Sequence, residues 1–122
     1  MFHSTRLFLV LILSFAFARQ VHGGESPEQT IGYLLNYVAN SKNTFIRNGA
    51  THTSDEAMKH INAKYEHFKS QIKTPEDFIR LSASKSLLSG KPYLVRTPDG
   101  KEQRLDDWLT AALKYHREQA TP

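Results

Sequence analysis

The sequence FIRNGATHTSDEAMKHINAKY, residues 45–65, joins a tight turn to the start of an amphipathic helix. Asn48-Gly49 is a dipeptide typical of turns, because both residues tolerate a positive φ. Thr53 or Ser54 is placed to cap a helix, and the two carboxylates that follow favour the positive end of its dipole. The stretch therefore predicts a turn followed by a helix that ends near Gln71.

One face of this helix is apolar and the edge beside it is charged. At about 100° per residue, an apolar band predicts the side packed on the core. Glu56, His60 and Lys64 follow one another at i, i+4 steps along the edge of that band. Such a row either supports the helix through weak side-chain contacts or forms the margin of a site. The apolar band contains Ala57, Ile61, Tyr65, Phe68 and Ile72, with Met58 at its edge.

Two further helices flank this one. Ser26 and Gln29 form a capping-box pattern with Pro27 at the first helical position, so a helix is expected from there to about residue 40. Residues 43–52 are expected to be a connection around the Asn-Gly turn. Thr74 followed by Pro75 predicts a third helix that runs to about Lys85.

The C-terminal part predicts a hairpin and a last helix. Pro98-Asp99-Gly100 lies between two short extended runs within residues 93–105, which is typical of a two-stranded hairpin. Asp106 is expected to cap the final helix. The expected fold is therefore α+β: three helices, a two-stranded β-hairpin and a C-terminal helix in one domain over residues 24–122. The core is expected to contain Ile31, Leu34, Leu35, Val38, Phe45, Ile61, Phe68, Ile72, Phe78, Ile79, Val95, Trp108 and Leu113.

Residues 1–23 have the pattern of a cleavable secretory signal peptide. A basic start is followed by an apolar run, Leu7 to Ala18, and then by small residues at Val21 and Gly23. The apolar run is shorter than the 20 or so residues that span a bilayer. The chain contains no cysteine, so no lipoprotein anchor is expected after cleavage, and the mature protein is expected in the periplasm or outside the cell.

The composition of the mature chain excludes several classes of function. Without Arg6 and Arg19 it has fourteen basic and twelve acidic side chains, and this balance argues against nucleic acid as a partner. The lack of cysteine excludes disulfides and thiolate chemistry. His60 and His67 are about 10 Å apart along a helix, too far to share one ion, so no metal is expected. No nucleophile or cofactor motif occurs, so no cofactor is expected.

The segments FIRNGATHTSDEAMKHINAKY, IKTPEDFI and SASKSLLSGKPYLV together resemble the YfeK-like family of small bacterial periplasmic proteins, a family of unknown function. The resemblance spans about residues 40–95, with a weaker match at Trp108-Leu109. It implies export and a single domain, but no reaction. The residues that carry it are Phe45, Arg47, Asn48, Gly49, Glu56, Ala57, His60, Lys64, Ser89, Gly90, Lys91, Pro92 and Tyr93.

A shared pattern that contains Arg, Asn, Glu, His and Lys is not explained by core packing alone. One hypothesis is a polar network that fixes the fold, with Arg47 bonded to Glu56 and His60 beside them. The other is a ligand cleft at the same place, closed by residues 89–93. The residues expected to line that cleft are Arg47, Asn48, His60, Lys64, Ser89, Gly90 and Tyr93.

The cleft hypothesis favours a non-enzymatic envelope binding or accessory module. Its basic lining would suit an anionic envelope ligand, such as a glycan carboxylate or phospholipid head group, or an acidic peptide. The alternative is a small hydrolase in which Glu56 and His60 act as an acid and base pair, which needs a third group to orient the imidazole.

Export is open to a direct test. Mass spectrometry of the exported protein should find a mature N-terminus near Gly24, because the small residues that precede it match a signal-peptidase site. An intact Met1 terminus recovered from the membrane fraction would contradict this prediction.

Overall fold

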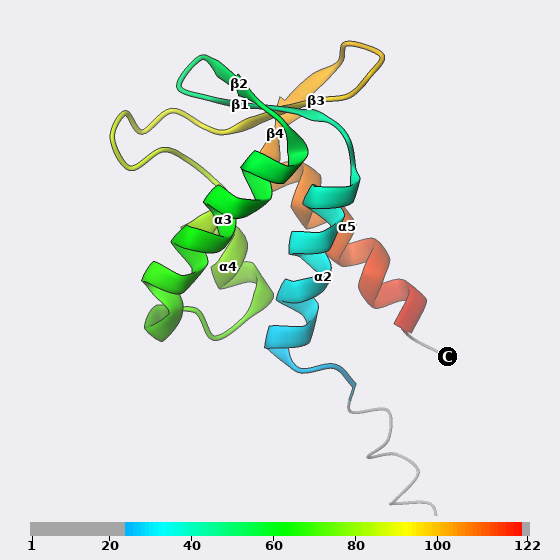
Figure 1. Ribbon diagram of the computed structural model, residues 1–122. Coiled ribbons are helices and arrows are strands. Elements are labelled where there is room, and N and C mark those ends of the chain that lie inside the picture. The colour runs from blue at the N-terminus through cyan, green and yellow to red at the C-terminus, as the bar shows by residue number, and fades with distance from the viewer. Residues whose placement is uncertain (1–23, 121–122) are drawn as a thin grey trace, which may run out of the picture.

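The computed structural model describes residues 24–120 and contains four α-helices and one antiparallel four-stranded sheet in that range (Figure 1). This is the α+β class expected from the sequence. The signal-peptide prediction lies outside the described residues. The elements in chain order are α2 (Pro27–Asn40), β1 (Thr44–Arg47), β2 (Ala50–His52), α3 (Ser54–Phe68), the 3₁₀ helix η1 (Lys69–Gln71), α4 (Pro75–Ser82), β3 (Leu94–Arg96), β4 (Glu102–Arg104) and α5 (Leu105–Ala120).

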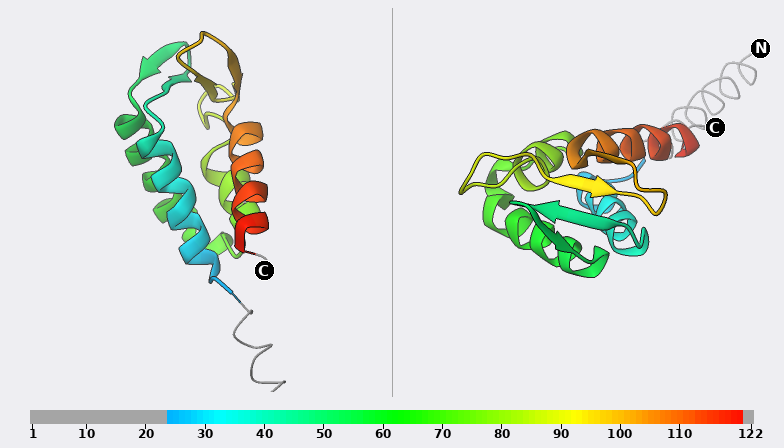
Figure 2. Two further views of the ribbon diagram at one scale, coloured as in Figure 1. Left: turned by 90° about the vertical axis from the view of Figure 1, so that its right-hand side faces the viewer. Right: turned by 90° about the horizontal axis from the view of Figure 1, so that it is seen from above.

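The sheet covers one end of a helical bundle. Its strand order is β2-β1-β3-β4, and every neighbouring pair is antiparallel. The four α-helices extend from the same side of the sheet, and α2 and α3 lie next to each other along much of their length (Figures 1 and 2). The helices therefore pack their first or last turns against one face of the sheet.

The predicted helix starts at Ser26, Thr53 and Thr74 are confirmed. Each of these residues accepts a hydrogen bond from the backbone three residues on and forms a full capping box with that residue's side chain. The predicted cap at Asp106 is wrong, because α5 begins one residue earlier, at Leu105. Asp106 lies in the first turn, where its carboxylate accepts two hydrogen bonds from Arg104.

The connection expected over residues 43–52 is instead a hairpin, β1–β2. Asn48 and Gly49 form its turn with φ angles of 52° and 79°, the pair of positive values that a type I′ hairpin turn requires. The predicted turn is thus confirmed, but the sheet has four strands where the sequence predicted two. Strands of three or four residues, paired partly with a segment about fifty residues away, leave too little periodicity to be recognised.

Most of the expected core is buried, including Phe78 and Leu34, both with no exposed surface. Leu35, Phe68 and Trp108 are only partly buried and pack against this core from outside. The Trp108 ring lies 4.7 Å from that of Tyr37 and 5.9 Å from that of Phe45, measured between centroids. Ala57 and Tyr65, which the apolar band of α3 predicted to face the core, are buried as well. Buried apolar residues that the sequence did not assign to the core include Ala83, Tyr93, Leu105, Leu109 and Ala112.

Phe78→Ala should lower the free energy of unfolding by about 3–5 kcal/mol, the usual cost of a large cavity in a packed core. Trp108→Ala should cost clearly less, because that ring is partly in contact with solvent. Urea denaturation followed by circular dichroism measures both. Equal losses for the two variants would contradict this ranking.

Candidate functional site

The pairing of β1 with β3 puts Arg47 and Tyr93 at one edge of the helix-facing side of the sheet. Phe45 pairs with Val95, and both are buried against the helices. Side chains alternate along a strand, so a residue two positions away points to the same side. Arg47 lies two positions after Phe45, and Tyr93 two positions before Val95.

Helix α3 supplies the facing side chains. His60 and Lys64 are one turn apart on it and both contact Tyr93. His60 Nε2 lies 3.1 Å from Tyr93 Oη, and Lys64 Nζ donates to the same oxygen at 3.1 Å. Arg47 Nη1 lies 2.6 Å from His60 Nδ1 and 3.0 Å from Nε2. Arg47, His60, Lys64 and Tyr93 thus form one connected group, called the basic cluster below.

The basic cluster contains two cations and no carboxylate. Neither Arg47 nor Lys64 forms an ion pair with an acidic side chain anywhere in residues 24–120. Lys64 is nonetheless buried, with 8% of its surface exposed. Besides Tyr93, its ammonium donates to the backbone carbonyl of Lys85 at 2.8 Å. A buried ammonium with only neutral partners is costly, because no opposite charge offsets its lost hydration.

Burial and neighbouring charges shift the pKa values of the groups in the basic cluster. Burial, and next the charges of Arg47, Lys64 and His52, lower the pKa of His60 from its ordinary value of 6.5 to about 4. Burial, and next Arg47, also lower the pKa of the Lys64 ammonium. Burial raises the pKa of the Tyr93 phenol. At neutral pH, His60 and Tyr93 are therefore uncharged.

The contacts leave the phenol hydrogen of Tyr93 unused. A guanidinium and an ammonium can only donate, so His60 must accept from Arg47 and Tyr93 must accept from Lys64. We assign the acceptor role to Nδ1, the ring nitrogen nearer to Arg47, which leaves the proton on Nε2. Nε2–H then donates to Tyr93 Oη, and the O–H of Tyr93 remains available to a ligand.

The segment between α4 and β3, residues 83–93, forms a second wall beside the cluster. Asn48 at the β1–β2 turn ties to it, since its amide nitrogen donates to Ser86 Oγ at 3.1 Å and its amide oxygen accepts from Ser89 Oγ. Gly90, with φ at 74°, donates its N–H to the Ser86 carbonyl at 2.9 Å. The two Asn48 bonds link segments that are about forty residues apart in sequence, whereas the Gly90 bond closes the loop itself.

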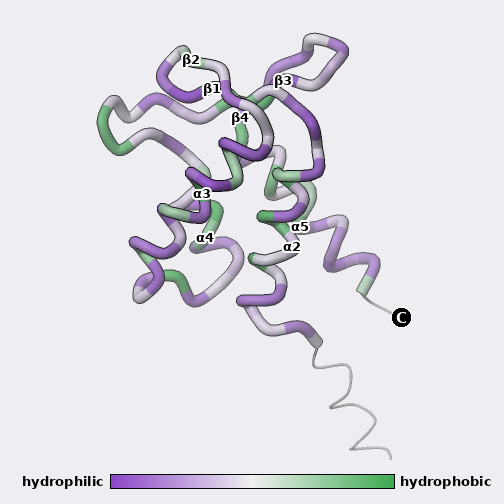
Figure 3. Tube along the Cα trace, in the orientation of Figure 1, coloured by the Kyte–Doolittle hydropathy of each residue, from purple (hydrophilic) through white to green (hydrophobic). Residues whose placement is uncertain are grey.

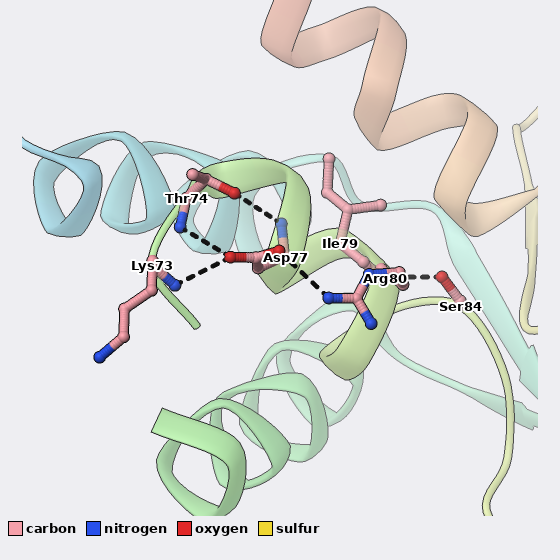
Figure 4. A network of polar contacts seen from close by, with 6 residues as sticks. All are labelled: Lys73, Thr74, Asp77, Ile79, Arg80 and Ser84. Carbon is pink, nitrogen blue, oxygen red and sulfur yellow. Dashed lines mark hydrogen bonds and ion pairs between the residues drawn. The ribbon is translucent and has the colours of Figure 1, made fainter. Parts of the chain in front are cut away.

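Both ends of the preceding helix α4 are also fixed by polar contacts (Figure 4). At its start, Thr74 and Asp77 form the capping box, and the Asp77 carboxylate also accepts from the Lys73 backbone at 3.0 Å. At its end, Ser84 Oγ donates to the Ile79 carbonyl at 2.8 Å. The loop that walls the site therefore starts from a well-anchored residue.

Between the loop and the hairpin lies an open groove of about 450 Å³. Arg47, His60, Lys64 and Tyr93 line it, and so do Leu87 and Leu88. Figure 3 shows apolar residues at the tip of this loop. His52, which also lines the groove, has a buried Nε2 with no hydrogen-bond partner within the described part of the chain. The groove is therefore lined by two cations that have no carboxylate partner among the described residues.

The predicted hydrogen bond between Arg47 and Glu56 is not formed among the described residues. Glu56 instead accepts from the Thr53 backbone at 2.9 Å and lies 3.8 Å from His52 Nδ1, both at the start of its own helix. The capping box holds the carboxylate there, whereas Arg47 turns toward His60. No hydrogen bond or ion pair joins Glu56 to His60 in residues 24–120, so the hydrolase alternative has no paired acid and base to build on.

The other residues expected at the cleft are found around this groove. Arg47, Asn48, His60, Lys64 and Tyr93 line it, while Ser89 and Gly90 belong to the loop that walls it. Sequence reasoning missed five lining residues: Ala50, His52, Ser86, Leu87 and Leu88. The two leucines had a usable signal, because adjacent large apolar residues are unusual in a turn rich in Ser, Gly and Lys. No sequence signal pointed to His52.

Within residues 24–120 no three His, Cys, Asp or Glu side chains are grouped so as to hold a metal ion. In the same range no helix has the length and apolar character needed to cross a membrane.

Comparison with known proteins shows which family this chain belongs to. A model for a family of unknown function, DUF5329, matches residues 25–117, and the chain belongs to that family. It is also 42% identical over 67 residues to the uncharacterized protein YfeK of Salmonella typhimurium, a match that covers 54% of this chain and 56% of YfeK. The chain thus spans about half the length of this relative. The resemblance seen in the sequence is confirmed, and no solved structure matches significantly.

The depressed pKa of His60 predicts a loss of stability in mild acid. The unfolded chain binds a proton at His60 near pH 6.5 and the folded chain only near pH 4, so protons favour unfolding between these values. The stability linked to His60 is present in full above about pH 6.5 and is lost as the pH falls toward 4.

Urea midpoints at pH 7, 5.5 and 4.5 test this for the wild type and His60→Gln. The variant should lose less stability than the wild type over this range, because it has no imidazole to protonate. Parallel losses in the two proteins would show that His60 does not titrate as described.

Proposed function

We propose that this protein is a non-enzymatic binding module of the bacterial envelope whose groove takes an anionic ligand. The observation that carries the proposal is the pair of cations, Arg47 and Lys64, that face one groove without a carboxylate partner in the described residues. Export, which supplies the envelope location, rests on the signal pattern of residues 1–23.

A network that served only to stabilise the fold would be expected to pair its cations with carboxylates. Buried cations that stabilise a fold are paired with carboxylates, because the pairing offsets part of the cost of desolvation. Here Glu56, the carboxylate that the sequence suggested as a partner for Arg47, instead accepts a hydrogen bond from the Thr53 backbone at the start of α3. The unpaired charges therefore support a ligand that brings the missing negative charge.

The donors in the groove suit a carboxylate or a phosphate. A guanidinium offers two parallel N–H groups to such an oxyanion, and an ammonium adds a compact point charge. The O–H of Tyr93 supplies one further neutral donor. Because His60 stays neutral and accepts from Arg47, it serves to orient the guanidinium.

Binding of simple anions tests the proposal. Inorganic phosphate and acetate, titrated into the ¹⁵N-labelled protein, should shift the amide resonances of β1, α3 and the 83–93 loop in a saturable way. Arg47→Ala and Lys64→Met should each weaken this binding at least about tenfold, the loss of one charge-assisted contact of roughly 1.5–3 kcal/mol.

Lys59→Ala provides the matched control. Lys59 lies on the same helix as Lys64 but is exposed and pairs with Asp55, so its loss should leave anion binding unchanged. Equal weakening in the control and in Lys64→Met would mean that only the general charge of the protein matters, and the proposed site would then be withdrawn.

The same variants separate a binding site from a structural network by their stability. Arg47→Ala should change the free energy of unfolding by less than about 1 kcal/mol, because no buried carboxylate loses its partner. Lys64→Met should leave it unchanged or raise it, since an apolar chain of similar length replaces a desolvated ammonium. A loss of several kcal/mol on either change, measured by urea denaturation, would favour the structural network.

A further inference from the structure

Two leucines beside the basic cluster are the most exposed large apolar residues in the described part of the chain. Leu87 has 68% and Leu88 has 95% of its surface exposed, ahead of Tyr115 at 59% and Tyr37 at 37%. They are adjacent in sequence and both line the same groove as Arg47 and Lys64. A single exposed leucine is ordinary, but a contiguous apolar patch at the margin of a polar site marks a binding surface.

Hydrogen bonds within the loop and to the β1–β2 turn hold Leu87 and Leu88 in their exposed positions. The backbone N–H groups of Leu88 and Ser89 donate to Ser86 Oγ at 3.2 and 3.4 Å. Ser86, itself buried, also donates its N–H to the Lys91 carbonyl at 3.0 Å, which closes the turn behind the leucines. Asn48 then fastens Ser86 and Ser89 to the β1–β2 turn. The loop is thus held in a shape that points two leucines away from the core.

The groove is therefore lined by two chemically different sets of residues. Arg47, Lys64 and the hydroxyl of Tyr93 offer only donors. Leu87 and Leu88, which line the same groove, offer apolar surface to whatever occupies it. A volume of about 450 Å³ lies within the range of small-molecule sites.

We propose that the ligand is an anionic amphiphile, a single molecule whose carboxylate or phosphate head contacts Arg47 and Lys64 and whose alkyl chain covers Leu87 and Leu88. This inference rests on the proposed function, because the same cations bind the head group. The alkyl chain explains what a small anion alone does not: two leucines held in solvent in the same groove as the cations. No covalent step is involved.

Binding of carboxylates of different chain length tests the inference by isothermal titration calorimetry, below their micelle concentrations. Octanoate should bind at least about tenfold more tightly than butanoate, because each methylene that leaves water contributes up to about fourfold. Octylammonium, which has the same chain and the opposite charge, should not bind measurably.

The double variant Leu87→Ser/Leu88→Ser should bind butanoate like the wild type and octanoate no more tightly than butanoate. Both side chains are exposed, so the variant should keep its fold, and circular dichroism checks this. Tyr115→Ser, an exposed apolar change outside the groove, should retain the full preference for octanoate.

Four results would overturn the inference. Equal affinity for butanoate and octanoate would remove the amphiphile while leaving the proposed anion site intact, whereas failure of phosphate, acetate and both carboxylates to bind would remove both. Association with phosphatidylglycerol vesicles without octanoate binding would make a bilayer surface the occupant. A dimer in solution that Leu87→Ser/Leu88→Ser dissociates, again without octanoate binding, would make the leucines an interface between copies of the chain.

Discussion

The antiparallel pairing of β1 with β3 is the contact on which both the fold and the groove depend. It joins segments about fifty residues apart and sets Phe45 opposite Val95, so that both side chains enter the core under the sheet. A slip of one residue in this register would turn the whole buried set to the other face, because the side-chain period of a strand is two. The same register carries Arg47 and Tyr93 onto α3, so the geometry of the groove follows from the packing of the core.

Around that pairing, the charged residues divide into two kinds. Most lie on the surface, and several are matched there, as where Arg104 bonds Asp106 or where Arg117 bonds Glu76. Such exposed pairs contribute little to stability and need no further explanation. Arg47 and Lys64 differ because they sit against neutral partners in a partly buried place, and that arrangement costs stability. Unpaired charges of this kind are typical of binding sites, where the ligand completes the electrostatics.

The groove is assembled from elements that are each locally stable. The capping boxes at Thr53 and Thr74 fix the starts of α3 and α4, and the Asn48-Gly49 turn fixes the end of β1. Asn48 then connects the turn to the loop through Ser86 and Ser89. Because every wall is held by hydrogen bonds of its own, the groove is preorganised, and a ligand that enters it need not order a flexible segment.

Local patterns in the sequence determined the helices, two of the turns and much of the core. Capping boxes, the Asn-Gly turn and the apolar band of α3 involve residues within a few positions of one another, so propensity and periodicity reveal them. The α+β class and the positions of three helix starts followed from such patterns. The spacing along α3 and the resemblance to the YfeK-like family together brought Arg47, His60 and Lys64 forward as candidates for a shared site, and the resemblance added Tyr93.

What the tertiary structure decided was which of these residues meet. The sequence suggested Arg47 beside Glu56, but the carboxylate is held by its own helix cap and Arg47 contacts His60 instead. Neither the pairing of β1 with β3 nor the position of Leu87 and Leu88 beside Lys64 has a local signature, because both depend on how distant segments pack. The burial of Lys64, and with it the absence of a compensating carboxylate, is likewise a property of the folded chain alone. Local sequence patterns indicate which residues could form a site, but long-range packing decides which charged and polar groups surround each of them. Those surrounding groups determine the electrostatics of the site.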